Sequence, residues 1–188
     1  MNEEIYKFIE KEMSIRRYGR KRGVILPALI NELKLGVGVE VGVDLGDNAK
    51  EILDKTSIYL YLVDNYEWRK KKVGKSRYDM AKEKLSIHLE NKRCEFLYGE
   101  SSFMANRIED NALDFCYIDA DHSYEGIKKD VTSWWPKVKV GGIFSGHDYK
   151  KKNDIKTTVM RYMDEFVIEN GLRLFALGGR GGGFLIVK

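Results

Sequence analysis

Two of the three histidines in the sequence stand beside aspartates, at two separate places. Asp119, Asp121 and His122 follow one apolar run, and His147 and Asp148 follow the next. An imidazole titrates near neutrality and can accept a proton, and neighbouring carboxylates can hold a divalent cation. If the two runs are adjacent strands of one sheet, their ends meet. The pattern therefore predicts a proton acceptor or a cation site.

A second candidate site begins at VEVGVDLGDNAKEIL, where Gly42 and Gly46 lie between an apolar run and a predicted helix. Small residues let the backbone approach a ligand, and a helix N-terminus attracts negative groups. The third glycine of a dinucleotide-binding loop is replaced by Asp47, and Asp44 adds a second negative charge. The loop therefore favours a ligand with a cationic centre over a pyrophosphate. A tight turn without a ligand is the alternative.

Further polar positions extend this candidate ligand site. Asp64 ends the run SIYLYLVD about twenty residues after Gly42, where an acid can accept hydrogen bonds from both hydroxyls of a ribose. An exposed loop position is the alternative for Asp64. Glu100 and Ser101 follow the next run, near the position expected for an adenine.

The candidate residues follow short apolar runs that alternate with amphipathic stretches. The runs predict strands at 37–43, 57–64, 94–98, 113–119 and 139–145, and the stretches predict helices at 48–55, 76–90, 101–108 and 123–135. Because parallel strands need crossover connections, this alternation predicts an α/β fold with the candidate residues at the carboxyl edge of a parallel sheet. After a helix at 155–169, runs at 171–177 and 184–188 flank GGRGGG and predict an antiparallel hairpin.

The composition is that of an ordinary globular protein. The 188 residues fit one domain, with 43% hydrophobic and 33% charged residues. No apolar run is long enough to cross a bilayer, the N-terminus has no signal-like apolar region, and Cys94 and Cys116 lie inside apolar runs. We therefore expect a cytoplasmic protein with reduced cysteines and no membrane partner.

The formal net charge is +4, and basic residues cluster at 16–22 and 69–75. Such clusters can attract phosphates, nucleic acid or an acidic substrate, or form a solvated surface. Because a charge of +4 is modest for a dedicated nucleic-acid binder, nucleic acid is not the expected partner.

At this point the chain resembles a known family. VEVGVDLG resembles the E-x-G-x-x-x-G motif of class I S-adenosylmethionine methyltransferases, and YLVD resembles their acidic motif. The stretch LDFCYIDADHSYEGIKKDVTSWWPKVKVGGIFSGHDY is similar to the later motifs of small-molecule O-methyltransferases, above all methyltransferase family 24. The resemblance implies a Rossmann-like doubly wound sheet, mostly parallel, with a C-terminal antiparallel hairpin. We expect one domain, with a helical cap at 1–35 and the core at 36–188.

The resemblance also implies roles for single residues. Those around S-adenosylmethionine would be Glu40, Gly42 and Gly46 at the methionine part, Asp64 at the ribose, Glu100 and Ser101 at the adenine, and Asp119. In metal-dependent relatives, the positions of Asp119, His147 and Asp148 bind magnesium, and that of His122 is the general base. Relatives usually carry aspartate at position 147. Magnesium prefers oxygen ligands, whereas imidazole suits manganese, iron or zinc better.

We therefore predict a methyltransferase that uses S-adenosylmethionine and methylates a small-molecule hydroxyl, such as that of a sugar or phenol. Help from a divalent cation, magnesium or manganese, is compatible with the site. The alternatives are an RNA methyltransferase and a non-catalytic protein that binds S-adenosylmethionine or a nucleotide. No N-P-P-Y/F tetrapeptide follows the fourth run, which argues against an RNA methyltransferase. The presence of Gly42, Gly46 and Asp64 together argues against a protein that has lost its catalytic function.

The two histidines also have structural interpretations. Asp121 or Ser123 could cap a helix beside an exposed His122, and His147 could pack in a loop. If His122 is not the general base, Asp121 is the next candidate. A homodimer is compatible with the sequence.

Overall fold

The computed structural model describes residues 2–15, 22–67, 76–152, 155–178 and 181–188. In these ranges, seven strands form one sheet in the order β3-β2-β1-β4-β5-β9-β8. They are β1 (Val37–Val41), β2 (Tyr59–Asp64), β3 (Cys94–Tyr98), β4 (Leu113–Ile118), β5 (Val138–His147), β8 (Leu174–Leu177) and β9 (Gly183–Val187). Strands β1 to β5 pair in parallel, and β9 is antiparallel to β5 and β8. The predicted α/β sheet with its C-terminal hairpin is confirmed.

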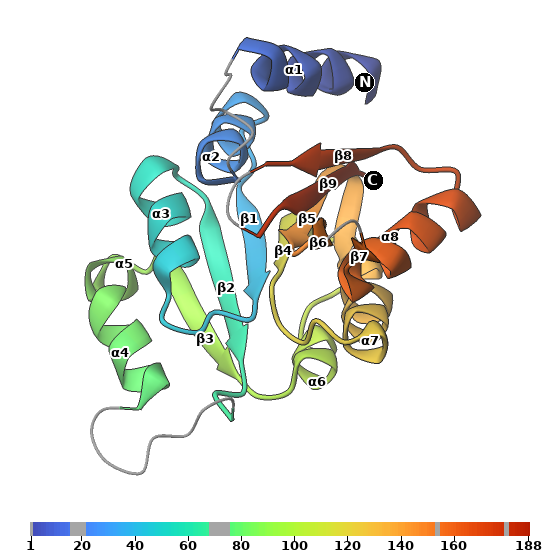
Figure 1. Cartoon of the computed structure of the whole chain (residues 1–188). Helices are drawn as coiled ribbons and strands as arrows, with labels where there is room; N and C mark the ends of the chain where they lie inside the picture. Colours follow the sequence, from blue (N-terminus) through green and yellow to red (C-terminus); the bar gives the residue numbers. More distant parts are fainter. Residues whose placement is uncertain (1, 16–21, 68–75, 153–154, 179–180) are drawn as a thin grey trace.

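Helices lie on both sides of this sheet (Figure 1). They are α1 (Asn2–Ile15), α2 (Arg22–Glu32), α3 (Asp47–Lys55), α4 (Arg77–Lys84), α5 (Ser86–Glu90), α6 (Ser101–Ala105), α7 (Tyr124–Trp134), the short 3₁₀ helix η1 (Trp135–Lys137) and α8 (Thr158–Glu169). Buried residues of α1, α2 and α3 belong to one apolar core, and those of α6, α7 and α8 belong to a second core. Two cores that sandwich one sheet are the arrangement of a doubly wound α/β fold.

Strand β4 shows why the predicted strands are almost uniformly apolar. Phe115 and Tyr117 belong to the first core, and Cys116 and Ile118 to the second, because successive side chains point to opposite faces. Cys116 and Cys94 are both buried and free, as the sequence predicts. Burial raises the pKa of the Cys94 thiol to about 11.

Several segments have other bounds than the sequence predicts, and two of them show the physical reason. The helix expected at 76–90 is divided at Leu85, whose side chain is fully buried and contacts the turn at Gly46. The helix expected from 155 begins only at Thr158, because β7 (Ile155–Lys156) pairs with β6 (Lys151–Lys152). Packing and backbone pairing decided both boundaries, and neither changes the periodicity from which the helices were predicted.

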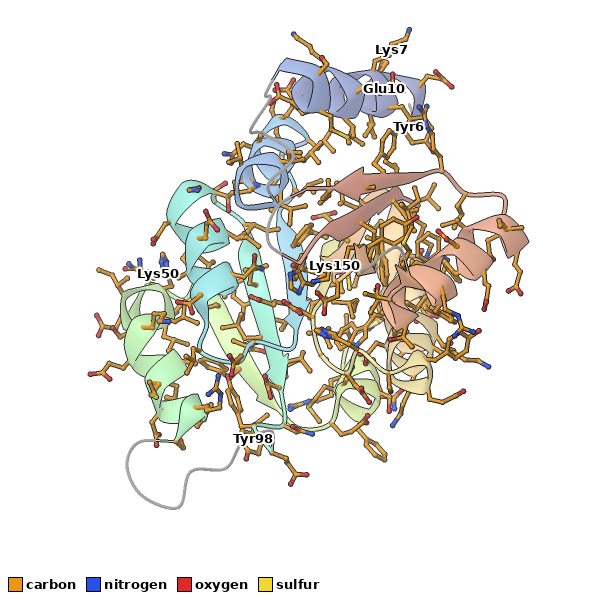
Figure 2. All side chains as sticks on the ribbon, viewed as in Figure 1. Tyr6, Lys7, Glu10, Lys50, Tyr98 and Lys150 are labelled. Carbon is orange, nitrogen blue, oxygen red and sulfur yellow. The ribbon has the colours of Figure 1, made fainter. Side chains whose placement is uncertain are left out.

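The N-terminal helix α1 packs against the edge of the sheet formed by β8. Ile9 is fully buried, and Tyr6 points toward β8, where its ring centroid lies 5.7 Å from that of Phe175 (Figure 2). Glu10 also forms an ion pair with Arg173. The basic clusters at 16–22 and 69–75 lie outside the described residues, apart from the backbone of Arg22. Among the described helices, none is long and apolar enough to span a membrane.

Candidate active site

A cleft of about 1040 Å³ opens at the carboxyl ends of β1, β2 and β4. Its walls come from the segments after these strands, from Gly99–Ser101 after β3, and from the first turns of α7. Ligands of open α/β sheets bind outside the carboxyl ends of the strands, at the point where the strand order reverses. In this sheet the order reverses between β1 and β4, so the cleft lies where the topology places a ligand.

Gly42 brings the loop after β1 against the end of β4. Its φ is 89°, and a Cβ atom there would lie 2.2 Å from the backbone oxygen of Asp119. The Asp119 amide donates a 2.7 Å hydrogen bond to the carbonyl of Val41. Only glycine allows this approach, so the sequence was informative at this position. Gly46 precedes α3 at a φ of 77°, and its neighbours Leu45 and Asp47 line the cleft. Its place beside the cofactor stays a prediction.

Asp64 ends β2 with its carboxylate held by backbone groups. Oδ2 accepts a 2.9 Å hydrogen bond from the amide of Asp44, and Oδ1 accepts a 2.7 Å bond from that of Tyr66. The Asp44 carboxylate in turn pairs with the Arg77 guanidinium. A carboxylate has about four lone-pair sites, so the two backbone bonds leave Asp64 able to accept more. Arg77 also lines the cleft, and nothing in its sequence context set it apart from the neighbouring basic residues.

Glu40 is the buried carboxylate of the cleft. It is 1% exposed, and its Oε1 accepts a 3.1 Å hydrogen bond from the side-chain amide of Asn48 at the start of α3. A negative charge with so little water around it acts strongly on a nearby cation. Glu40 therefore suits a ligand with a positive centre, as the acidic loop predicted.

The wall expected near an adenine contains Glu100 and Ser101. Glu100 caps α6, and its Oε1 lies 2.7 Å from Nζ of Lys129 on α7. Trp134 donates a 2.9 Å hydrogen bond to Oγ of Ser101. Asp130 completes this wall: it is 4% exposed, and burial raises its pKa to about 6. Lys129 and Asp130 were missed by the sequence interpretation, because on an amphipathic helix they look like surface charges.

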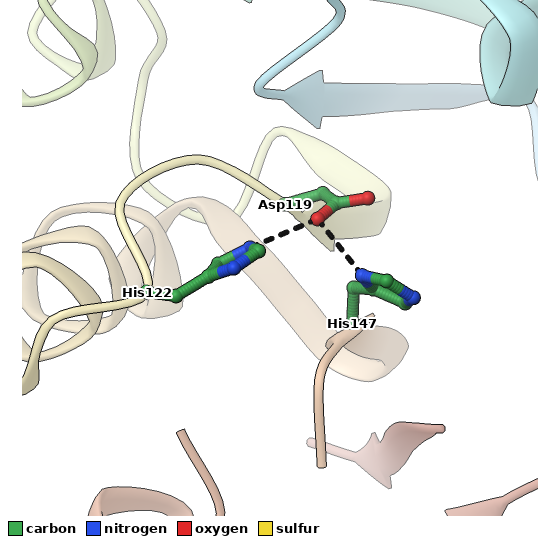
Figure 3. A group of neighbouring side chains, drawn as sticks. All are labelled: Asp119, His122 and His147. Atoms are coloured by element: carbon green, nitrogen blue, oxygen red, sulfur yellow. Dashed lines mark hydrogen bonds and ion pairs between the residues drawn. The ribbon is translucent and has the colours of Figure 1, made fainter. Parts of the chain in front are cut away.

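The structure brings Asp119, His122, His147 and Asp148 together, as the strand topology required. Asp119 follows β4 and His147 ends the neighbouring β5. Oδ1 of Asp119 lies 3.0 Å from Nε2 of His122 and 3.2 Å from Nδ1 of His147 (Figure 3). Nδ1 of His122 lies 2.8 Å from Oδ2 of Asp148. Asp119 and His122 line the cleft, whereas His147 and Asp148 stand behind them.

The charges of this corner favour a protonated His122. Its hydrogen bond with Asp119 raises the pKa of His122, although burial acts in the opposite direction. Burial would raise the pKa of Asp119, but the hydrogen bonds with His122 and His147 outweigh it and hold that pKa below its usual range. Both ring nitrogens of His122 face carboxylates, so both act best as donors. The role of His122 as a base, which requires the neutral ring, stays a prediction.

Asp121 belongs to the turn rather than to this corner. It is exposed, and its Oδ1 accepts a 2.9 Å hydrogen bond from the amide of Ser123. Ser123 caps α7 by accepting a bond from the amide of Gly126. Helix capping, one reading of this segment, is therefore present, and it coexists with the contacts of His122.

The sheet order and the cleft are those of a Rossmann-like methyltransferase core. The model of methyltransferase family 24, described as a methyltransferase domain, matches residues 39–149. This match covers more than half of the chain, and the chain belongs to that family. A comparison with curated protein sequences finds no match.

Solved structures of methyltransferases share the fold. An O-methyltransferase from Bacillus cereus in complex with S-adenosylhomocysteine has a TM-score of 0.64 and 16% identity, covering 99% of this chain and 90% of its own. An S-adenosylhomocysteine-bound methyltransferase from Podospora anserina has a TM-score of 0.68 and 11% identity, covering 97% and 86%. A methyltransferase from Geobacter sulfurreducens has a TM-score of 0.66 and 12% identity, covering 97% of this chain and 86% of its own. At these identities the likeness concerns the fold.

Proposed function

We propose that this methyltransferase uses S-adenosylmethionine to methylate a hydroxyl oxygen of a small molecule. One observation carries the proposal: a single cleft is lined both by the Asp64 carboxylate and by the Asp119–His122 pair. The first suits a ribose, and the second suits a hydroxyl that must lose its proton. The O-methyltransferase from Bacillus cereus, bound to S-adenosylhomocysteine, supports this choice of cofactor and acceptor atom. These relatives do not favour RNA methylation or a non-catalytic role.

The cofactor would lie along the loop after β1. The remaining lone pairs of Asp64 would accept the ribose hydroxyls, and the buried Glu40 would face the positively charged methionine part beside Gly42. Glu100, Ser101 and the adjoining Asp130 would border the adenine. The sulfonium would then lie near Asp119, because the backbone of Gly42 lies against the backbone of that residue.

For methyl transfer, the acceptor oxygen attacks the methyl carbon in line with the carbon–sulfur bond, which breaks and leaves a neutral thioether. The cleft must align these atoms, and the hydroxyl proton must leave. We assign the proton to the corner of Asp119 and His122. A direct base must be neutral, whereas the contacts of His122 favour imidazolium. A divalent cation held at Asp119 would supply a second way to release the proton, because it would lower the pKa of a hydroxyl bound to it.

Calorimetry with S-adenosylhomocysteine tests the cofactor. We expect a dissociation constant in the micromolar range, which corresponds to a binding free energy of about −8 kcal/mol. Transfer of labelled methyl from S-adenosylmethionine to a panel of phenols and sugars then tests the acceptor. Absence of cofactor binding would overturn the proposal, and methyl transfer to RNA alone would replace it with the RNA reading.

We also propose a cytoplasmic location and a single functional domain. The two buried free cysteines support a cytoplasmic location, where thiols stay reduced. We assign the whole chain to one functional domain, because α1 packs on β8 of the core. A homodimer stays compatible with the chain.

A further inference from the structure

Asp119 lies between two imidazoles that come from different strand ends. His122 stands in the loop after β4, and His147 is the last residue of β5. One ligand atom from each of these three side chains can be chosen so that all three atoms lie within 4.8 Å of one another. Figure 3 shows both rings directed at the same carboxylate.

The spacing of these atoms fits a metal ion. Bonds from a metal to imidazole nitrogen or carboxylate oxygen are about 2.0–2.2 Å long, so two ligands at a right angle lie roughly 3 Å apart. The observed separations from Oδ1 of Asp119 are 3.0 Å to Nε2 of His122 and 3.2 Å to Nδ1 of His147. A dication could therefore take the place of the protons that these contacts now share, with little movement.

Each ring is also held in place from its other side. Nδ1 of His122 lies 2.8 Å from Oδ2 of Asp148, and metal-binding histidines usually donate their second ring nitrogen to a carboxylate in this way. Behind His147, the backbone of Gly181 comes so close that a Cβ atom there would lie 2.1 Å from Nε2. His122 is thus oriented by Asp148, and His147 is bordered by backbone, while a nitrogen of each ring lies at Asp119.

The chemistry of the donors selects the kind of ion. Magnesium demands oxygen ligands in near-octahedral geometry, and two imidazole nitrogens do not supply them. Two histidines and one carboxylate with open positions suit divalent iron and its neighbours in the first transition series. His122 is the most exposed of the three, with 41% of its side chain accessible, so the open side of the set faces the cleft.

We propose that Asp119, His122 and His147 bind a first-row transition-metal dication in preference to magnesium, and that Asp148 orients His122 as a ligand. This differs from the ligand set of Asp119, His147 and Asp148 that the family resemblance implied. The binding site stands on the contacts alone, and only its use in lowering the pKa of a hydroxyl rests on the proposed function.

Cobalt(II) is a suitable probe, because its visible absorption reports nitrogen ligands and geometry. We expect saturable binding of one Co²⁺ by the wild type, undisturbed by a large excess of Mg²⁺. Replacing His147→Asn puts an oxygen where Nδ1 lies, and His122→Gln puts one near Nε2, so both variants keep a polar atom but lose the imidazole. Each should weaken Co²⁺ binding by more than tenfold, and Asp148→Asn by about tenfold to a hundredfold.

Asp121→Asn is the matched control. It removes a neighbouring carboxylate that is not one of the three ligands but keeps the oxygen that accepts the bond from Ser123, and its Co²⁺ affinity should fall far less than that of the two histidine variants. His147→Asp should shift the preference toward Mg²⁺, because it adds an oxygen ligand at the same place. Circular dichroism verifies that each variant is folded before it is titrated.

Three results would overturn the proposal: no Co²⁺ bound by the folded wild type, Mg²⁺ bound as tightly as Co²⁺, or His122→Gln and His147→Asn variants that bind Co²⁺ like the wild type. Calorimetry with S-adenosylhomocysteine on the same samples separates the two proposals. Cofactor binding without Co²⁺ binding defeats only the metal site. Co²⁺ binding without cofactor binding defeats only the proposed function.

Discussion

Asp64 is the residue on which the cofactor assignment can be tested most directly. Asp64→Ala should weaken S-adenosylhomocysteine binding by roughly 1–3 kcal/mol, because charge-assisted bonds to the ribose are lost. Asp64→Asn, which keeps one acceptor oxygen, should lose less. Calorimetry measures both. The distant surface variant Asp110→Ala, at a carboxylate paired with Lys137, is the control and should bind like the wild type. Equal affinities for all four proteins would contradict the assignment.

Asp130 should make stability depend on pH. Burial raises its folded-state pKa to about 6, against roughly 4 in an unfolded chain. The folded state therefore binds this proton more tightly than the unfolded chain does. The contribution of the protonated Asp130 to the free energy of unfolding is full below pH ~4 and is lost as the pH rises through about 6. Above that, a buried charge remains, and Oδ2 has no hydrogen-bond partner among the described residues.

The change that tests this is Asp130→Asn. It should stabilise the protein at pH 8, by up to about 3 kcal/mol, and have little effect at pH 4. Urea unfolding at the two pH values gives both differences. Asp110→Asn, at an exposed carboxylate, should show no such pH-dependent gain. A stability difference for Asp130→Asn that is the same at pH 4 and pH 8 would refute the expected titration.

At the scale of elements, the loop between β1 and α3 is fixed by its approach to β4. Gly42→Ala would bring both a strained φ of 89° and a Cβ atom 2.2 Å from the backbone oxygen of Asp119. Gly171 has a φ of 62° with nothing within 4 Å of the added Cβ, so Gly171→Ala brings the strain alone. Strain of this kind costs roughly 1–2 kcal/mol.

Chemical unfolding should therefore show a larger loss for Gly42→Ala than for Gly171→Ala, by more than about 1 kcal/mol. The first variant should also bind S-adenosylhomocysteine more weakly, because the displaced loop lines the cleft. The second should bind it normally. Equal losses of stability would mean that the contact with Asp119 adds nothing to the strain.

The elements themselves could be predicted where local periodicity decides them. The run CEFLY predicted β3 with both ends correct, and the hairpin around GGRGGG appears as β8 and β9. The break at Leu85 and the pairing of β6 with β7 could not, because long-range packing and pairing cause them. Residues that follow strands could likewise be assigned to the site, whereas Lys129 and Asp130 could not, because only the tertiary fold brings α7 to the cleft.

At the scale of the whole molecule, the sheet topology explains why Asp119, His122, His147 and Asp148 lie together, but it does not explain their individual contacts. Adjacent parallel strands predicted that residues 119–122 and 147–148 would meet. The sequence could not predict that His122 would bridge two carboxylates, because that depends on the course of the loop before α7. The same contacts raise the pKa of His122, because its hydrogen bond with Asp119 favours the protonated ring.

The overall charge of +4 supports one last prediction, about nucleic acid. Binding to RNA should be weak and independent of sequence, because a modest positive charge attracts phosphates without reading bases. A protein that neutralises about four phosphates loses roughly a hundredfold in affinity between about 50 and 200 mM salt. Fluorescence anisotropy with two unrelated RNA oligonucleotides over this range should show equal affinities and that steep decline. A tight, sequence-selective complex at physiological salt would instead favour RNA as the methyl acceptor, with the basic clusters at 16–22 and 69–75 as its contact surface.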